Sequence, residues 1–242
     1  MSYFVFNGTS SAELGVRIIS KNIYSAPKYD INLISIPGRN GELVSNNGRF
    51  SNVGVSYSCF LPAKTIDELG TKIRNVKKWL YAEPGEYHDL SDSFDSLFFR
   101  KAIFNSKLDV TDQVSKIGIF TVSFSCLPFK YSEEGQEVIT ITEATEIYNP
   151  YPFDSKPYLK IYGSGNGTLV FDSEEGIKTW TIANISSYVE CDSELMNFYK
   201  GTQLKNSDVT GSTFPILKPG TNYIAFTGGI TSIEIIPRWV SL

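Results

Sequence analysis

The side chains of this sequence that could do acid–base or metal chemistry gather around its one histidine. His88 is followed closely by Asp89, Asp92 and Asp95. An imidazole among carboxylates can bind a metal ion, or it can act with a carboxylate as general acid and base. The spacing matches neither the two-histidine pattern of zinc enzymes nor the loop of an EF-hand. We therefore interpret the stretch as a polar loop between a helix and a strand, with Asp and Ser bonding the local backbone, and predict no metal site.

A glycine-rich stretch, GSGNG at residues 163–167, invites comparison with a phosphate-binding loop. The third glycine of a dinucleotide fingerprint would fall at residue 168, which is threonine, and a strand pattern follows instead of a helix. Asn166-Gly167 is better interpreted as a hairpin turn, because both residues tolerate positive φ. The sequence therefore predicts no bound cofactor.

The sequence offers few residues suited to hydrolytic catalysis. A single histidine and the lack of a G-x-S-x-G motif argue against a serine hydrolase. The 26 Asp and Glu residues leave a glycosidase open, because sequence alone does not locate a carboxylate pair. We predict no catalytic residue and keep the glycosidase as the least favoured alternative.

Trp180 is the best candidate for a sugar-binding platform, since an indole can stack on a sugar ring. It alternates with Ile182 in the run TWTIANI, which favours a core position for its side chain. Both interpretations stay open at this stage.

The run SIPGRNGEL at residues 35–43 interrupts two strand-like segments. Proline fixes φ and donates no hydrogen bond, while glycine accepts φ values closed to other residues, so this run forms a shaped corner. An arginine within such a corner can bind a ligand's phosphate or carboxylate, but it more often bonds nearby carbonyls or a neighbouring subunit. We predict that this corner lies at an interface between subunits, through Pro37, Gly38, Arg39, Asn40 and Gly41.

Composition bounds the class of protein. The chain has 242 residues, of which 41% are hydrophobic and 14% aromatic, so it should fold, and its richness in aromatic residues favours strands. A net charge of −4 without a basic run argues against general nucleic-acid binding. There is no apolar stretch long enough for a membrane segment and no signal-peptide pattern, so we expect synthesis in a cytosol. The cysteines are widely spaced and odd in number, which predicts buried free thiols at Cys59, Cys126 and Cys191.

One helix is expected among many strands. It should begin at Thr65, three residues before Glu68 in capping-box spacing, and end before Pro84-Gly85. Its apolar residues, from Ile66 to Leu80, recur at helical spacing. Residues 117–126 alternate in polarity, which is typical of a strand with one face on a core.

The composition shifts after Tyr131, where an acidic and then proline-rich stretch begins. We predict a domain over residues 1–135, a linker over 136–156 and a second domain over 157–242. The first should be an α+β domain resembling a β-sandwich, and the second, with many short strands, a jelly-roll β-sandwich. The expected fold class is therefore mainly β with one helix.

Several motifs occur in an order that resembles the distal tail protein family of long, non-contractile-tailed bacteriophages. They are F-N-G with a nearby serine (Phe6 to Ser10), I-P-G-R-x-G (Ile36 to Gly41), F-x-C-x-P-F-x-Y (Phe124 to Tyr131), G-x-x-F-P-x-L-x-P-G-x-N (Gly211 to Asn222) and a closing P-R-W (Pro237 to Trp239). The resemblance spans essentially the whole chain.

This resemblance implies a structural protein of a phage or prophage. In the family, the N-terminal domain assembles into a hexameric ring that continues the tail tube, and the C-terminal domain is a galectin-like β-sandwich. The partners implied are further copies of the chain, the major tail (tube) protein, a tail-tip hub protein of the tail-associated lysin type and, in many phages, a receptor-binding protein. The location implied is the virion tail tip, after assembly in the bacterial cytoplasm. The rival interpretation is a carbohydrate-binding module that acts through the C-terminal sandwich.

Overall fold

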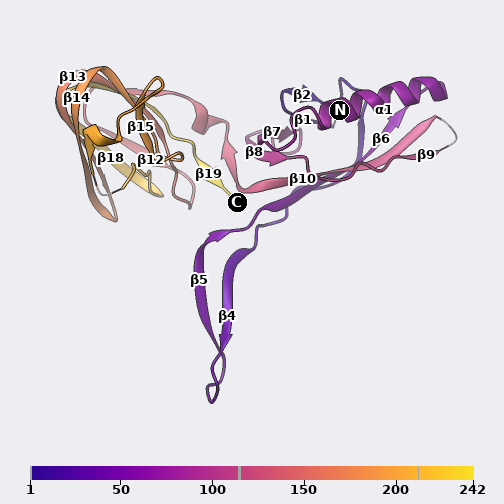
Figure 1. Ribbon diagram of the computed structural model, residues 1–242, viewed down its shortest axis with the longest axis horizontal. Coiled ribbons are helices and arrows are strands. Elements are labelled where there is room, and N and C mark those ends of the chain that lie inside the picture. The colour runs from indigo at the N-terminus through magenta and orange to yellow at the C-terminus, as the bar shows by residue number, and fades with distance from the viewer. Residues whose placement is uncertain (1, 114–115, 212) are drawn as a thin grey trace. The chain divides into compact units, whose positions relative to one another are not determined.

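The computed structural model describes residues 2–113, 116–211 and 213–242 (Figure 1). The chain divides into two compact units. Unit 1 runs to Lys130 and includes Leu242, and unit 2 covers Tyr131–Ser241. Strands predominate in both, and the described residues contain one α-helix, so the predicted fold class of mainly β with one helix is confirmed.

Unit 1 is built on an antiparallel sheet with the strand order β2-β1-β7-β8-β10-β6-β3, and β9 also pairs with β10. Its strands are β1 (Phe4–Phe6), β2 (Thr9–Ser10), β3 (Arg17–Asn22), β6 (Val53–Pro62), β7 (His88–Asp92), β8 (Phe98–Ile103), β9 (Thr111–Gln113) and β10 (Ile117–Ser132). The pairing of β6 with β10 runs from Val53↔Cys126 to Pro62↔Ile117. Where the two strands pair, every second residue of each is buried, which confirms the alternation predicted for residues 117–126.

Helix α1 (Ile66–Leu80) covers one face of this sheet's core. The Thr65 side chain accepts a hydrogen bond from the Glu68 backbone N–H, so the predicted N-cap is confirmed. Trp79 packs near Phe4 and donates its indole N–H to the Phe6 carbonyl at 2.9 Å. Ile66, expected on the buried face, is 59% exposed because it lies in the first turn, beyond the edge of the core.

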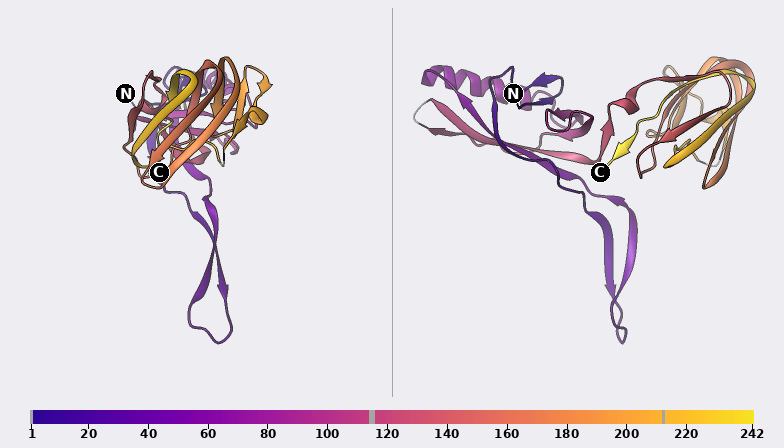
Figure 2. Two further views of the ribbon diagram at one scale, coloured as in Figure 1. Left: turned by 90° about the vertical axis from the view of Figure 1, so that its left-hand side faces the viewer. Right: turned by 180° about the vertical axis from the view of Figure 1, so that it is seen from behind.

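Between β3 and β6 the chain forms a separate two-stranded hairpin, β4 (Tyr29–Ser35) and β5 (Glu42–Phe50), which we call the arm. Figures 1 and 2 show it extending away from the sheet of unit 1. Near its base the Tyr29 and Phe50 rings meet edge to face, and Phe50 in turn contacts Phe129. Most of the arm's residues are exposed in the single chain.

Unit 2 is an antiparallel sheet with the order β11-β18-β13-β14-β15-β16, in which β12 also pairs with β18 and β17 with β14. Its strands are β11 (Ile139–Ile141), β12 (Thr145–Asn149), β13 (Tyr158–Ser173), β14 (Gly176–Asp192), β15 (Asn197–Lys200), β16 (Gln203–Leu204), β17 (Val209–Thr210) and β18 (Gly220–Ile236), with 3₁₀ turns η1 (Glu134–Gln136) and η2 (Asn206–Asp208). Strand β19 (Val240–Ser241) is not part of this sheet. Residues 136–156, expected to be a linker, instead contribute β11 and β12 to this sheet. Their own alternation, with Ile141 and Ile147 buried, explains why.

The second difference from expectation concerns strand length. The sequence predicted many short strands and a hairpin turn at residues 163–167, but β13 passes through that stretch without reversing. A register shift between Gly165 and Gly167 makes it a β-bulge, and both halves of β13 stay paired with β14 and β18. The bend brings side chains from both halves of the strands into one core, among them Ile161, Phe171 and Trp180.

Candidate functional site

The five residues predicted at a subunit interface lie together at the tip of the arm, and all five are exposed. Arg39 N–H donates to the Ile36 carbonyl at 3.2 Å, with Pro37 and Gly38 between them. Gly38 has φ of +80°, so this is a type II turn, in which proline and glycine are the residues that the geometry requires. The sequence motif therefore shapes a projecting corner.

The two strands of the arm carry apolar side chains on both faces. Leu33 is paired with Val44 and Ile34 with Leu43, and because neighbouring residues of a strand point to opposite faces, one pair lies on each face. Their exposed fractions are between 44% and 57%. A two-stranded hairpin is marginal in water, and clustered exposed apolar residues mark an interaction surface. The arm therefore presents an exposed apolar surface on each of its two faces.

A polar cluster lies near the base of the arm. Asp30 accepts hydrogen bonds from Arg49 Nε at 2.6 Å and from Asn47 Nδ2 at 3.0 Å. These bonds, that of Arg49 above all, hold the pKa of the Asp30 carboxyl below its usual value. The pairing register shifts between Tyr29 and Ile31, which adds a bulge in β5 at the same level. A bulge bends a strand and increases its twist, so the arm is bent near its base.

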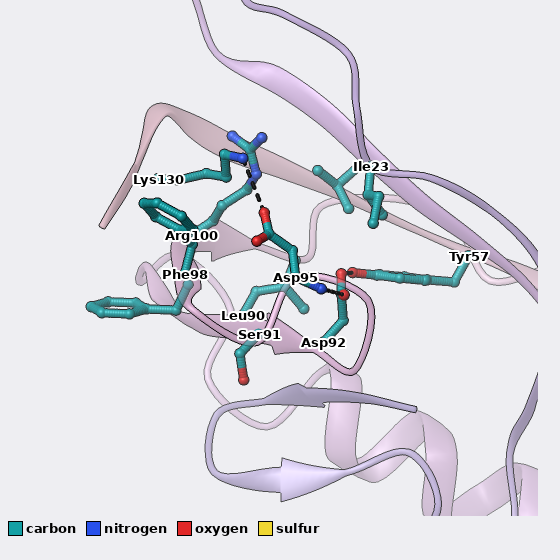
Figure 3. Close-up of a pocket in the computed structure, with 11 residues that line it drawn as sticks. Ile23, Tyr57, Leu90, Ser91, Asp92, Asp95, Phe98, Arg100 and Lys130 are labelled. Carbon is teal, nitrogen blue, oxygen red and sulfur yellow. Dashed lines mark hydrogen bonds and ion pairs between the residues drawn. The ribbon is translucent and has the colours of Figure 1, made fainter. Parts of the chain in front are cut away.

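Unit 1 also contains a small cavity of about 20 Å³ lined by charged side chains (Figure 3). Asp92 accepts a hydrogen bond from the Tyr57 hydroxyl at 2.7 Å, and Lys130 lies 3.0 Å from Asp95. Arg100 is 7% exposed, and its Nη1 has no hydrogen-bond partner within the described structure. Burial lowers the pKa of Arg100. The volume admits a single water molecule, so this is a structural polar cluster, too small for an organic substrate.

The fold separates His88 and Asp89 from each other, whereas Asp92 and Asp95 both line the small cavity described above. Residues 88–92 form strand β7, so adjacent side chains there point to opposite faces. Residues 93–97 form the predicted polar loop, in which Asp92 Oδ1 accepts hydrogen bonds from the backbone N–H groups of Phe94 and Asp95. The His88 ring packs edge to face on Phe6, and Asp89 pairs with Lys101 at 2.6 Å. In the part of the chain that the structure describes, no three His, Cys, Asp or Glu residues are grouped as metal ligands.

Trp180, the sugar-platform candidate, lies in the core of unit 2. It is 2% exposed, contacts Phe171 edge to face and donates its N–H to the Thr213 carbonyl. Neither face of its ring is available to a sugar. The three cysteines are buried and free, as predicted, and burial raises the pKa of each thiol to about 12.

Sequence reasoning missed a different feature of unit 2. Tyr162 and Tyr188 lie beside an open depression at the bend of the long strands, with ring centroids 6.3 Å apart. The signal was present in the spacing of Tyr158, Lys160 and Tyr162, which places them on the face of β13 opposite the buried Leu159 and Ile161.

The architecture of the two units, one with a helix-covered sheet and a projecting hairpin and the other with long bent strands, is that of the phage distal tail (Dit) proteins. The crystal structure of the Dit protein (gp 19.1) of phage SPP1 matches with a TM-score of 0.76 and 12% sequence identity over 97% of each chain. That protein is described as a paradigm of the hub adsorption apparatus in phages that infect Gram-positive bacteria. A chain of the phage P2 baseplate in its activated conformation matches with a TM-score of 0.52 and 8% identity, over 97% of this chain and 96% of that one.

The chain thus has the Dit fold, which confirms the resemblance inferred from the sequence motifs at the level of fold. No family model and no curated protein sequence matches it. Among the described residues, no helix has the length and apolar character needed to span a membrane.

Proposed function

We propose that this chain is a structural, non-enzymatic component of a phage or prophage tail. In this role it forms a hexameric hub at the distal end of the tail tube and joins the tube to the tail-tip or baseplate proteins. The observation that carries the proposal is the match to the SPP1 Dit hub protein, which extends over 97% of both chains and so includes both units.

The arm supports self-association. A closed ring requires a heterologous contact, in which a surface of one copy meets a different surface of the next. A hairpin with exposed apolar residues on both faces is suited to the donor side of such a contact. We assign the ring contacts to the N-terminal domain and the tip residues Pro37 to Gly41 to the subunit interface.

The remaining partners follow from the same role. They are the major tail (tube) protein on one side of the ring, a tail-tip hub protein on the other and, where present, a receptor-binding protein. The net charge of −4 suits a ring through which DNA passes, because a basic wall would retain phosphates through several contacts. The site of action is the virion tail tip, after assembly in the bacterial cytoplasm.

The solution mass of the purified chain tests the proposal. Light scattering should give six times the mass of the chain, alone or after addition of a major tail (tube) protein, and negative-stain images should show a six-fold ring. A chain that stays monomeric under both conditions overturns the hexameric hub. A lumen lined mainly by Lys and Arg would overturn the argument from charge.

A further inference from the structure

The small polar cavity of unit 1 contains a cationic side chain whose hydrogen-bonding capacity is not filled. Residues alternate between the two faces of β8, so Arg100 points to the same side as Ala102 and as its cross-strand neighbour Leu90, and both of these are buried in the core. The strand therefore carries a guanidinium into the interior. Arg100 Nη1 has no hydrogen-bond partner within the described structure. Buried polar atoms are nearly always paired, so an unpaired one indicates a bound water molecule or ion.

The two carboxylates that line the cavity are engaged by other groups. Asp92 Oδ2 accepts a hydrogen bond from the Tyr57 hydroxyl at 2.7 Å, and its Oδ1 accepts from two backbone N–H groups of the following loop. Asp95 Oδ2 accepts from Lys130 Nζ at 3.0 Å (Figure 3). Neither carboxylate is a hydrogen-bond partner of Arg100 Nη1. The partner of this atom therefore has to come from outside the chain.

Positive charge exceeds negative charge around the cavity. Two cations, Arg100 and Lys130, line it together with the two carboxylates. The loop that follows β7 adds a third cation, because Lys21 Nζ lies 3.5 Å from the centroid of the Phe94 ring within that loop. Burial lowers the pKa of Arg100, but an arginine stays protonated at neutral pH. Since Arg100 is only 7% exposed, water screens its charge poorly and the attraction for an anion is strong.

The volume of the cavity selects a small occupant. The space of about 20 Å³ holds one particle of the size of a water molecule and is too small for phosphate, sulfate or an organic acid. A water molecule would pair with Arg100 Nη1 but would leave the positive charge unmatched. A halide ion accepts the hydrogen bond and also provides the missing negative charge. Lys130 offers a second donor, since its ammonium carries three hydrogens and Asp95 accepts only one of them.

We propose that this cavity is a binding site for a single halide ion, such as chloride, held by Arg100 Nη1 and Lys130 Nζ. The ion completes the charge balance beneath the loop of residues 93–97 and ties that loop to β8 and β10. It makes the stability of unit 1 depend on chloride, which a structural role in a tail does not require. The site does not rest on ring formation, so this proposal and the proposed function can fail separately.

Melting curves of the purified full chain at constant ionic strength test the site. Sodium gluconate is replaced stepwise by sodium chloride and, in a second series, by sodium bromide, because gluconate is too large for the cavity. We expect the melting temperature to rise by about 3 °C and then to saturate with either halide, since a ligand that binds only the folded state stabilises it. A rise that grows linearly with halide concentration is a general salt effect and overturns the site, as does the absence of any rise.

Two variants locate the ion. Arg100→Gln removes the guanidinium that faces the cavity, so its melting temperature, whatever its starting value, should no longer respond to chloride. Lys101→Gln is the matched control, because it removes a charge from the neighbouring position on β8, where the side chain points to the opposite face and pairs with Asp89. The control should keep the full response. A chloride response that persists in Arg100→Gln, or one that is lost in Lys101→Gln, overturns the assignment.

Crystals of the wild-type chain soaked in sodium bromide provide a test that needs no variant. One anomalous peak should lie within hydrogen-bond distance of both Arg100 Nη1 and Lys130 Nζ. Density at this place without an anomalous signal identifies a water molecule, and either that result or an empty cavity refutes the proposal.

Discussion

The arm of unit 1 and the bend of unit 2 are both built from glycine-rich sequence, yet they use glycine in opposite ways. At the arm tip, Gly38 lets the chain reverse in open solvent, where nothing lies within 4 Å of the position of a Cβ. At the bend, Gly229 lets two paired strands approach until a Cβ has no room. The first glycine provides a conformation and the second provides space. Substituting a glycine in a turn changes only the local backbone. Substituting a glycine where two strands approach closely forces the paired strands of the sheet apart.

The sharpest test of this comparison is Gly229→Ala, with Gly54→Ala as its control. The added methyl would collide with the backbone of Ser164, so the strands must separate at the cost of about 3 kcal/mol in the free energy of unfolding. Gly54 lies on β6 with open space around it, and its replacement should change that free energy by less than about 0.5 kcal/mol. Chemical denaturation measures both. Equal changes in the free energy of unfolding for Gly229→Ala and Gly54→Ala would show that close strand approach does not require glycine at position 229.

The second test concerns the polar clamp that holds the C-terminal segment of unit 2. Arg238, at φ of +56°, makes a bidentate ion pair with Asp192, with both distances at 2.9 Å. Asp192→Asn should lower the free energy of unfolding at pH 7 by about 2 kcal/mol, because the partly buried guanidinium of Arg238 loses its charged partner. Glu194→Gln is the control, since Glu194 is more exposed and lies 3.7 Å from Arg238. An Asp192→Asn variant as stable as the control would contradict the role of the clamp.

The same clamp predicts a pH dependence. Burial opposes ionisation of Asp192, but the bonds from Arg238 and two backbone N–H groups outweigh it and hold its pKa below the usual value. A lowered folded-state pKa stabilises the protein above the unfolded value of about 3.9, and this contribution is lost as the pH falls through the folded pKa. The stability difference between the wild type and Asp192→Asn should therefore shrink as the pH falls below about 4. Thermal melts from pH 7 to pH 3 measure it, and a constant difference would refute the assignment.

In the arm, substitutions should affect assembly and spare the fold. The double variant Leu33→Ser, Val44→Ser removes one apolar pair from an exposed face, so the melting temperature of the monomer should change little. Its ring should be lost or weakened in light scattering. Thr121→Ala, at an exposed position on the sheet of unit 1, controls for surface substitution as such. Rings of normal size in the double variant would show that the arm does not form the contact between subunits.

The smallest expected effect is that of Gly38→Ala. The positive φ strains an alanine at this position, but nothing lies within 4 Å of its Cβ, so the free energy of unfolding should fall by only about 1 kcal/mol. The same denaturation assay compares the loss of stability in Gly38→Ala, at a turn, with that in Gly229→Ala, where two strands approach closely. A large loss of global stability in Gly38→Ala would mean that the tip is coupled to the core.

Much of the fold could be predicted from local pattern. The alternation of β10 and the cap at Thr65 are properties of a few neighbouring residues, and the structure has both. The bulge at residues 163–167 could not be predicted this way. A hairpin and a bulge use the same residues, and the outcome depends on whether the two flanking segments pair with each other or each pair with β14 and β18. The acidic stretch after residue 131 suggested a linker, because the gain from burying Ile141 and Ile147 against β18 appears only when that strand is in position.

For the candidate sites the same limit applies. The turn at the arm tip could be recognised from the sequence, because a type II turn is favoured by proline and glycine in adjacent positions. The depression beside Tyr162 could not be predicted from the sequence, since it is lined by residues of β13, β14 and β18 that are up to 72 positions apart in the chain. The interpretation of the stretch after His88 as a polar segment whose aspartates bond the local backbone needed only neighbouring residues, and Asp92 makes such bonds.

By itself, the sequence determined the features that depend on residues a few positions apart: the capped helix, the alternating strands, the shaped corner at the arm tip and the motifs of a Dit fold. Only the tertiary structure decided that the arm leaves its apolar residues exposed, that the glycines at 163–167 bend a strand without ending it, and which polar groups meet. The reason is physical. Local patterns set backbone conformation, whereas burial and hydrogen-bond partners depend on which distant strands lie alongside.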